Sequence, residues 1–437
     1  MSNWQEEYKS KLTSNEEAVK LISKNQLVCI GMAIASPEAV VHALSKRLPE
    51  LGYLNMLSMN VGYPFEFLSN PEYKKYFKLY SYFLGPLERT CENSDNIEVV
   101  PFHLGQFDYL IRNHYKIDVL ITEVTPPDDE GNMSFSVGGA MQDVMVRVAS
   151  KVIVSVNNRA PYIATSPANL IHVSKVDAIV ENNHEIFETP EIPITDVEKK
   201  IAHLIADRIE DGSTIQIGMG GLANAIGYFL DDKKDLGIHT EMISDSIMEL
   251  AKKGVITGNK KTLHPGQIVC SLPLGTRSLY DWIDHNPTIA FHPISYVNDP
   301  NVIAKNDNLV SVMNALIVDL SGQVGSESIG FNQYSNTGGQ VEFVRGAFLA
   351  KNGKSYIALN STTETKKGLI SRIVSSFPPG QVVTTPRTDV DSLVTEYGIA
   401  ELRGKSIPDR VKAMINIAHP QFRDELTSEA KKAGILY

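Results

Sequence analysis

Short apolar segments that alternate with helical segments are the feature that most limits the folds open to this chain. The runs Leu54–Asn60, Val119–Val124 and Val152–Val156 are largely apolar, which is typical of strands buried on both faces of a parallel sheet. Segments with helical periodicity, such as Ala140–Val148, lie between strands of this kind. This alternation predicts an α/β fold with mainly parallel sheets.

Size and charge narrow the classes of function. A chain of 437 residues is long enough for two or three domains. Its 41 basic and 51 acidic residues give a formal charge of -10, so we expect neither a nucleic-acid partner nor an anionic membrane surface. Residues 1–11 are polar and no apolar run approaches the roughly 18 residues of a membrane span. We therefore expect a cytoplasmic protein, in which Cys29, Cys91 and Cys270 are ordinary thiols.

The stretch 184–197 predicts a linker, because it contains two prolines and has no helical period. We therefore expect an N-terminal α/β domain over residues 1–186 and a C-terminal one over 187–437. Ile30-Gly31-Met32 in the first half matches Ile217-Gly218-Met219 in the second, and Leu51-Gly52 matches Leu236-Gly237. The match suggests two related halves, but it is too short to establish the repeat.

The segment 215–245 predicts the candidate active site. It contains a strand ending at Ile217, a glycine turn over Gly218–Gly221, a helix over Leu222–Leu230 and a second strand over His239–Asp245 that carries Glu241. Backbone N–H groups of such a turn can point at an anion, and a carboxylate at the adjoining strand can reach the same space. At the corresponding place the first half carries Asn55-Met56, with no carboxylate.

Three interpretations of this segment stay open from the residues alone. Gly218 to Ala223 satisfy the G-x-G-x-x-A dinucleotide fingerprint, with Glu241 about 20 residues on, so the segment could bind an NAD-type cofactor. Alternatively, Glu241 is a covalent nucleophile and the turn stabilises a reacting oxyanion. The third interpretation is a tight structural turn beside a structural carboxylate.

Other clusters carry weaker signals. The acids in Asp128-Asp129-Glu130 do not have EF-hand spacing, and the histidine-glutamate pair at 184–185 lacks the second histidine of a zincin, so we expect no metal site. Gly338–Gly339 form a second glycine turn, which we expect to precede an apolar strand and to present further N–H donors. Lys354 is a candidate for contact with a phosphate or ribose. Further strands are expected at 267–271, 290–292, 315–319, 355–359, 381–385 and 393–395, and a polar, helical C-terminus over Ile407–Lys432.

Five motifs together resemble the acetyl-CoA hydrolase/transferase family of class I CoA-transferases, most closely its 4-hydroxybutyrate and butyrate CoA-transferases. The motifs are Pro126-Pro127-Asp128-x-x-Gly131, Asp211-Gly212-Ser213-Thr214, residues 236–245 around His239-Thr240-Glu241, residues 338–347 from Gly338-Gly339-Gln340 onward, and Thr395-Glu396-Tyr397-Gly398-Ile399-Ala400.

The resemblance implies that Glu241 forms a glutamyl-CoA thioester, and that Gly218, Met219, Gly220, Gly221 and Leu222 line the CoA site together with Gly338 and Gly339. It also implies two domains of the CoA-transferase fold with the active site between them, in a homodimer or higher homo-oligomer. Acyl-CoA and small carboxylic acids would be the substrates, with no permanently bound cofactor.

The implied reaction moves CoA between acetyl-, butyryl- or 4-hydroxybutyryl-CoA and a free carboxylic acid, through an acyl-glutamyl anhydride and glutamyl-CoA. Members for 4-hydroxybutyrate tend to have isoleucine and alanine where this chain has Met219 and Gly221, so the acyl group stays open. The alternatives are a dicarboxylate acceptor such as succinate or itaconate, an acyl-CoA hydrolase, a CoA-binding protein without turnover and, remotely, an NAD-dependent dehydrogenase.

Overall fold

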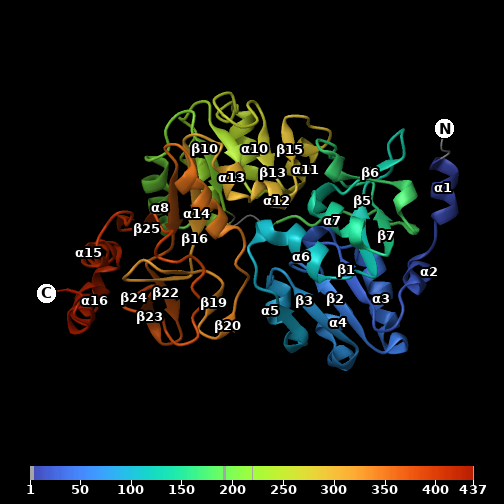
Figure 1. The fold of residues 1–437 in the computed structure, drawn as a ribbon, viewed down its shortest axis with the longest axis horizontal. Coiled ribbons are helices and arrows are strands. Elements are labelled where there is room, and N and C mark those ends of the chain that lie inside the picture. The colour runs from blue at the N-terminus through green and yellow to red at the C-terminus, as the bar shows by residue number, and fades with distance from the viewer. Residues whose placement is uncertain (1–3, 190–192, 219, 437) are drawn as a thin grey trace. The chain divides into compact units, whose positions relative to one another are not determined.

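The computed structural model describes residues 4–189, 193–218 and 220–436 and divides into two compact units (Figure 1). Unit 1 consists of Met1–Thr189 and Cys270–Tyr296, and unit 2 of Pro190–Val269 and Val297–Tyr437. Each unit is therefore built from two separate stretches of the chain. The division at residue 187 stays a prediction, and the return of Cys270–Tyr296 to unit 1 is not expected from it.

Unit 1 is organised around a parallel sheet with the strand order β4-β3-β2-β1-β5-β7-β9. Alternate residues of β1 enter different hydrophobic clusters: Val28 and Ile30 belong to one, and Cys29 to the other. Both faces of the strand are therefore buried, as its apolar run predicts. The strands are β1 (Leu27–Ile30), β2 (Leu54–Ser58), β3 (Phe77–Ser81), β4 (Ile97–Val99), β5 (Val119–Val124), β7 (Lys151–Val156) and β9 (Ala178–Glu181).

Helices and short strands complete unit 1, and β6 and β8 form a small antiparallel sheet. Helix α3 contributes to the cluster that contains Val28, whereas α6 and α7 contribute to the cluster that contains Cys29. The elements are α1 (Trp4–Lys11), α2 (Asn15–Ala18), α3 (Glu38–Leu51), α4 (Glu66–Ser69), α5 (Pro86–Thr90), α6 (Phe107–His114), β6 (Asn132–Ser134), α7 (Met141–Val148), β8 (Leu170–His172), β14 (Leu272–Pro273), α11 (Arg277–Ile283) and β15 (Ile289–Phe291).

Unit 2 contains a parallel sheet in which the strands follow the order β13-β11-β10-β16-β21-β25, and β26 pairs antiparallel with β25. These strands are β10 (Thr214–Ile217), β11 (Gly237–His239), β13 (Ile268–Cys270), β16 (Leu309–Asn314), β21 (Lys354–Ala358), β25 (Ser392–Thr395) and β26 (Gly398–Glu401). The helices around it are α8 (Asp196–Ala206), α9 (Gly221–Tyr228), α10 (Asp245–Lys252), α13 (Pro300–Ile303) and α14 (Gln340–Leu349). Helix α12 (Ile294–Val297) lies where the chain passes from unit 1 to unit 2.

The two sheets share one strand order. The run β3-β2-β1-β5-β7-β9 of unit 1 corresponds to β13-β11-β10-β16-β21-β25 of unit 2, which supports the repeat suggested by the two Ile-Gly-Met segments. The predicted α/β fold with mainly parallel sheets is confirmed. The strand register also corrects the alignment: Leu27 pairs with Asn55 as Thr214 pairs with Gly237. Glu241 therefore corresponds to Met59 rather than Met56, and the first unit has a buried methionine at this place.

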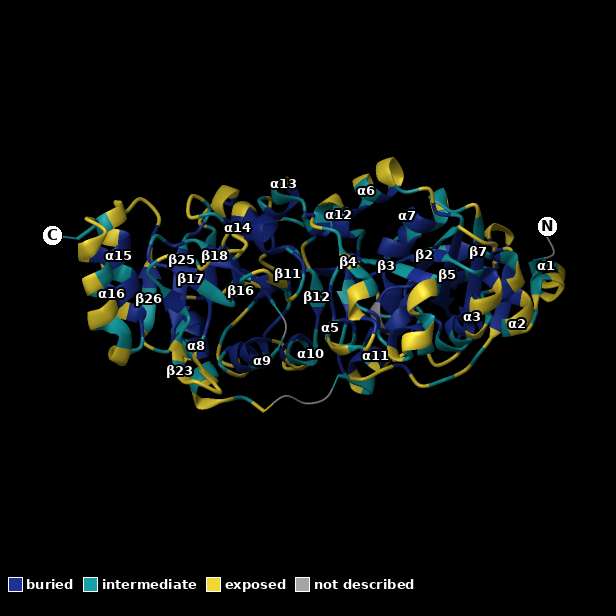
Figure 2. Ribbon diagram, turned by 90° about the horizontal axis from the view of Figure 1, so that it is seen from below, coloured by how far each residue is buried: buried dark blue, intermediate teal, exposed yellow. Residues whose placement is uncertain are grey.

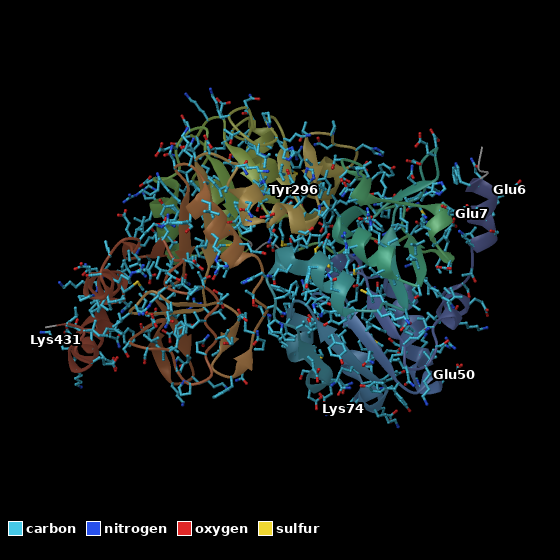
Figure 3. All side chains as sticks on the ribbon, in the orientation of Figure 1. Glu6, Glu7, Glu50, Lys74, Tyr296 and Lys431 are labelled. Carbon is cyan, nitrogen blue, oxygen red and sulfur yellow. The ribbon has the colours of Figure 1, made fainter. Side chains whose placement is uncertain are left out.

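The rest of unit 2 consists of short strands and two terminal helices. They are β12 (Met242–Ile243), β17 (Ile317–Asp319), β18 (Val324–Gly325), β19 (Ser328–Ile329), β20 (Asn332–Gln333), β22 (Thr362–Thr365), β23 (Gly368–Ser371), β24 (Ile373–Val374), α15 (Ile407–Ile417) and α16 (Pro420–Lys432). Buried residues of α15 and α16, including Met414 and Leu426, share a core with β17 and β25. Figure 2 shows that α16 also has an exposed surface, and Lys431 at its end lies in solvent, as does Lys74 in unit 1 (Figure 3).

Two local predictions are wrong. The segment after Gly339 is the helix α14 and not a strand, because the turn begins a helix whose residues are buried on most sides. Residues 381–385 form no strand and contribute only the bridge between Thr385 and Val324. The predicted helical C-terminus is confirmed, and it consists of two helices because Pro420 cannot continue the first.

Candidate active site

Glu241 lies just beyond the end of a parallel strand. The predicted strand over His239–Asp245 is wrong in extent, because β11 ends at His239 and α10 already begins at Asp245. Strands β10 and β11 are parallel neighbours, so their carboxyl ends lie at one edge of the sheet, and the Thr240 hydroxyl donates to the Ile217 carbonyl at 3.4 Å. Glu241 and the first glycine turn therefore leave the sheet at the same edge.

The first glycine turn joins β10 to α9. Gly218 donates its N–H to the Val312 carbonyl at 3.0 Å. Gly220 has φ of 101° with open space around the position of a Cβ, so glycine is required here for its backbone conformation. A Cβ on Gly221 would instead overlap the carboxylate of Glu198, and Leu222 is buried. Met219 lies outside the described residues.

The second glycine turn approaches the Glu241 carboxyl directly. Gly338 has φ of 63°, and Gly339 is the N-cap residue of α14. A Cβ on Gly339 would lie less than 3.0 Å from both Glu241 Oε2 and Asn298 Nδ2. The structure thus brings two predicted features together, the candidate nucleophile and the second turn, and only a residue without a side chain fits between them.

Asn298 and Glu342 complete the surroundings of Glu241. Asn298 Nδ2 donates to Glu241 Oε2 at 2.9 Å and lies 3.3 Å from Glu342 Oε2. Asn298 is fully buried and Glu342 nearly so. Neither residue is predicted from the sequence to belong to the site. Glu342 lies within the family motif 338–347, but Asn298-Asp299-Pro300 looks like an ordinary turn and carries no signal of this contact.

Burial raises the pKa of Glu241 above its ordinary value, and the hydrogen bond from Asn298 offsets part of this shift. The residue keeps an intermediate exposure, but its carboxyl group is poorly solvated because Gly339 and Asn298 enclose it. A poorly solvated carboxylate held by one amide is suited to nucleophilic attack, since little solvent has to be removed from it.

The raised pKa predicts how Glu241 affects stability. The Glu241 carboxyl holds its proton more tightly in the folded protein than in the unfolded chain. Protonation of Glu241 therefore stabilises the fold fully below the pKa of the unfolded chain, and this stabilisation is lost as pH rises through the pKa of the folded protein. We expect Glu241→Gln, which stays neutral, to be more stable than the wild type at pH 8. Calorimetric unfolding between pH 4 and 8 measures this gap, which should close toward pH 4. A gap independent of pH would contradict the prediction.

Lys354 does not join this group. It begins β21, where it pairs with Val310, while β16 and β10 begin at the paired residues Leu309 and Thr214. Lys354 therefore lies at the amino edge of the sheet, opposite the edge from which Glu241 emerges, and its Nζ pairs with Glu210 at 3.2 Å. Contact of Lys354 with CoA stays a prediction that the surroundings of Glu241 do not support.

The acidic cluster of the first unit forms a hydrogen-bonded turn. Asp128 accepts bonds from the backbone N–H groups of Glu130 and Asn132 at 2.9 and 2.8 Å, and from the Tyr162 hydroxyl at 2.7 Å. Within the described ranges, no group of three or more His, Cys, Asp or Glu residues could hold a metal ion. None of the helices in the described part of the chain is both long enough and apolar enough to cross a membrane.

Comparison with known proteins identifies the family. Residues 1–190 match the family model of the acetyl-CoA hydrolase/transferase N-terminal domain, and residues 275–430 match that of the C-terminal domain. The chain is 42% identical to a 4-hydroxybutyrate coenzyme A transferase of Clostridium kluyveri, over 98% of this chain and 99% of that one. It is 37% identical to a butyryl-CoA:acetate CoA-transferase of Anaerostipes caccae, over 99% and 98% of the two chains.

A solved structure extends the likeness to the fold. The crystal structure of RipA from Yersinia pestis superimposes with a TM-score of 0.92 at 35% identity, covering 99% of this chain and 100% of that one. The resemblance drawn from the five motifs is confirmed, and the chain belongs to the acetyl-CoA hydrolase/transferase family.

Proposed function

We propose that the protein is an acyl-CoA:carboxylate CoA-transferase in which Glu241 carries CoA covalently. The names of its relatives support the class of reaction, since both transferases compared above move CoA between acyl groups. The observation that carries the assignment to Glu241 is its desolvated carboxyl, which the Asn298 amide holds and the Gly339 backbone adjoins.

The proposed reaction proceeds by two acyl exchanges. A carboxylate oxygen of Glu241 attacks the thioester carbonyl of an acyl-CoA, and the C–S bond breaks to give an acyl-glutamyl anhydride and CoA thiolate. The thiolate attacks the glutamyl carbonyl and expels the first carboxylate, which leaves glutamyl-CoA. A second carboxylic acid then reverses these steps and departs as the new thioester. The anhydride is itself activated, so one difficult exchange becomes several easier ones.

Main-chain donors near Glu241 would stabilise the oxyanion of each tetrahedral intermediate. The N-terminus of α14 begins at Gly339, and the first N–H groups of a helix have no acceptor within the helix. Loss of a single oxyanion donor typically slows an acyl transfer by on the order of 10²–10³-fold. The N-terminus of α9, at the turn Gly218–Leu222, is the second set of donors that the proposal assigns to CoA or its thioester.

The proposed substrates are a short-chain acyl-CoA, such as acetyl-, butyryl- or 4-hydroxybutyryl-CoA, and a small free acid. A dicarboxylate acceptor and hydrolysis by water are the alternatives within the same chemistry, because they differ only in what attacks the activated glutamyl group. We also propose a homodimer or larger homo-oligomer, which light scattering after size exclusion would test.

A screen of carboxylic acids tests the proposed function. Acetyl-, butyryl- and succinyl-CoA are each incubated with acetate, butyrate, 4-hydroxybutyrate, succinate and itaconate, and new thioesters are measured by mass spectrometry. We expect exchange with the monocarboxylates, and inactivation by borohydride only after incubation with acyl-CoA, because the reagent reduces a thioester of Glu241. Release of free CoA without any new thioester would identify a hydrolase, and full resistance to borohydride would argue against the covalent carrier.

A further inference from the structure

The proposed nucleophile, Glu241, and a second carboxylate, Glu342, contact the same carboxamide, that of Asn298. Asn298 Nδ2 lies 2.9 Å from Glu241 Oε2 and 3.3 Å from Glu342 Oε2. A carboxamide nitrogen has two hydrogens, so one can point to each carboxylate. Glu342 therefore adjoins the group that holds Glu241, although it does not itself accept a hydrogen bond from Glu241.

The pair of carboxylates selects one orientation of the Asn298 side chain. Rotating the amide by half a turn would place Oδ1 against two carboxylate oxygens, which are acceptors only when ionised. In the orientation observed, no described residue hydrogen-bonds to Oδ1, so the contacts of Nδ2 are what fix the plane of the amide. Without Glu342, Glu241 alone would have to determine that plane.

A purely structural role would explain Glu342 as an acid in the first turn of α14, where it favours the helix dipole. The first unit provides the comparison. Gly139, with φ of 62°, and Ala140, the N-cap residue of α7, correspond to Gly338, with φ of 63°, and Gly339, the N-cap residue of α14. Asp143 is therefore the first-turn acid that corresponds to Glu342, and its carboxylate pairs with Arg147 of the same helix at 2.8 Å. The helix dipole accounts for an acid at this place in both units, but it does not account for the contact of Glu342 with Asn298.

The contact with Asn298 distinguishes Glu342 from its counterpart. In the first unit the position of Glu241 is taken by Met59, and Asp143, the counterpart of Glu342, pairs with Arg147 of its own helix. In unit 2 both positions carry a carboxylate, and Asn298 connects them. We propose that Glu342 is a positioning residue. It fixes the orientation of the Asn298 amide, and the amide in turn holds the Glu241 carboxylate in the position for nucleophilic attack. This inference rests on the proposed function of Glu241.

Glu342→Gln tests whether Glu342 fixes the orientation of the Asn298 amide, and it keeps the size of the side chain. A glutamine amide can donate or accept, so it no longer selects one orientation of Asn298. We expect kcat for CoA exchange to fall about 10- to 100-fold, because small displacements of a reacting group have costs of this order, while KM for acyl-CoA stays within about twofold. A merely structural defect would lower the amount of folded enzyme but not kcat per folded molecule, so the folded fraction is measured by calorimetry and kcat is referred to it.

A double variant shows whether Glu342 acts through Asn298. Asn298→Ala removes the amide, so adding Glu342→Gln to it should slow the enzyme no further, whereas independent defects would multiply. The matched control is Glu88→Gln, because Glu88 is a fully buried acid of unit 1 that bonds to Ser81 and Gly85; it should change stability but not kcat per folded molecule.

The outcomes separate the inference from the proposed function. An unchanged kcat in Glu342→Gln, or multiplied losses in the double variant, would overturn the role of Glu342 while leaving Glu241 as the carrier. Absence of exchange in the wild-type enzyme would instead overturn the proposed function. If Glu342→Gln does not fold, Glu342→Asp takes its place: it keeps the charge, and its loss of kcat should likewise vanish in the Asn298→Ala background.

Discussion

Glu241→Ala should lower kcat for CoA exchange by on the order of 10⁴-fold or more, since it removes the group to which CoA is transferred. Glu241 Oε2 is the carboxylate oxygen that lies against both Gly339 and the Asn298 amide. Glu342 is the other acid at Asn298, but it is on α14 and nearly buried. The measurement is the initial rate of thioester exchange, with peptide mass spectrometry to detect any CoA adduct.

Two further variants sharpen this result. Glu241→Asp keeps the charge but withdraws the carboxyl by roughly one C–C bond, about 1.5 Å, so it should be nearly as slow as the alanine variant. Glu364→Gln changes an exposed acid on β22 and should leave exchange unaltered. The variants at 241 should fold normally, because each removes or shifts a poorly solvated charge. Exchange above about 1% of the wild-type rate in Glu241→Ala would mean that CoA has another carrier.

The parts of the site that follow from local sequence were predicted well. The strand over 214–217 and the helix after its glycine turn lie within one or two residues of their predicted bounds. An apolar strand, a turn glycine and a helix start each have a signal within a few neighbouring residues of the sequence. The strand β5 has its predicted bounds. Glu241 could be singled out because it is an acid in an apolar setting immediately beyond such a unit.

The remaining site residues could not be found in this way, because their relation to Glu241 is a tertiary contact. Asn298 and Glu342 are separated by 44 positions, and Asn298 lies 57 positions from Glu241. Three side chains meet only when β11, the segment after α12 and the start of α14 have been placed by the sheet. A single sequence does not show which of these distant residues are in contact. An asparagine before a proline is also common in turns, so nothing in the sequence marks Asn298 as a site residue.

Helix α14 shows a different limit. Val341 and Phe343 alternate with polar residues, which favours a strand, and β-branched and aromatic residues strengthen that impression. In the structure Val341, Phe343 and Val344 are all buried, and so are Gln340 and Glu342. A helix buried on most sides loses the one-sided pattern from which helices are recognised. The helical assignment also changes the chemistry, because it places a helix N-terminus rather than a strand beside Glu241.

Gly339→Ala should reduce kcat by about 10²–10³-fold with little loss of stability. The added methyl group would overlap Glu241 Oε2 and Asn298 Nδ2, so it must displace the carboxyl, the amide or the backbone that would face the oxyanion; each displacement costs rate on this scale. The backbone itself tolerates alanine, because φ at Gly339 is -98°. We therefore expect the free energy of unfolding to change by no more than about 1 kcal/mol.

Gly254→Ala is the matched control for the replacement of a glycine. Gly254 follows α10 with φ of 77° and has open space where the Cβ would be added, so alanine there should cost about 1 kcal/mol of stability through backbone strain and leave kcat unchanged. Comparing kcat and unfolding in the two variants separates the fit of the turn around Glu241 from the general effect of replacing a glycine. If Gly339→Ala retains wild-type kcat, the turn does not adjoin the reacting carboxyl during catalysis, and the main-chain donors at α14 lose their proposed role.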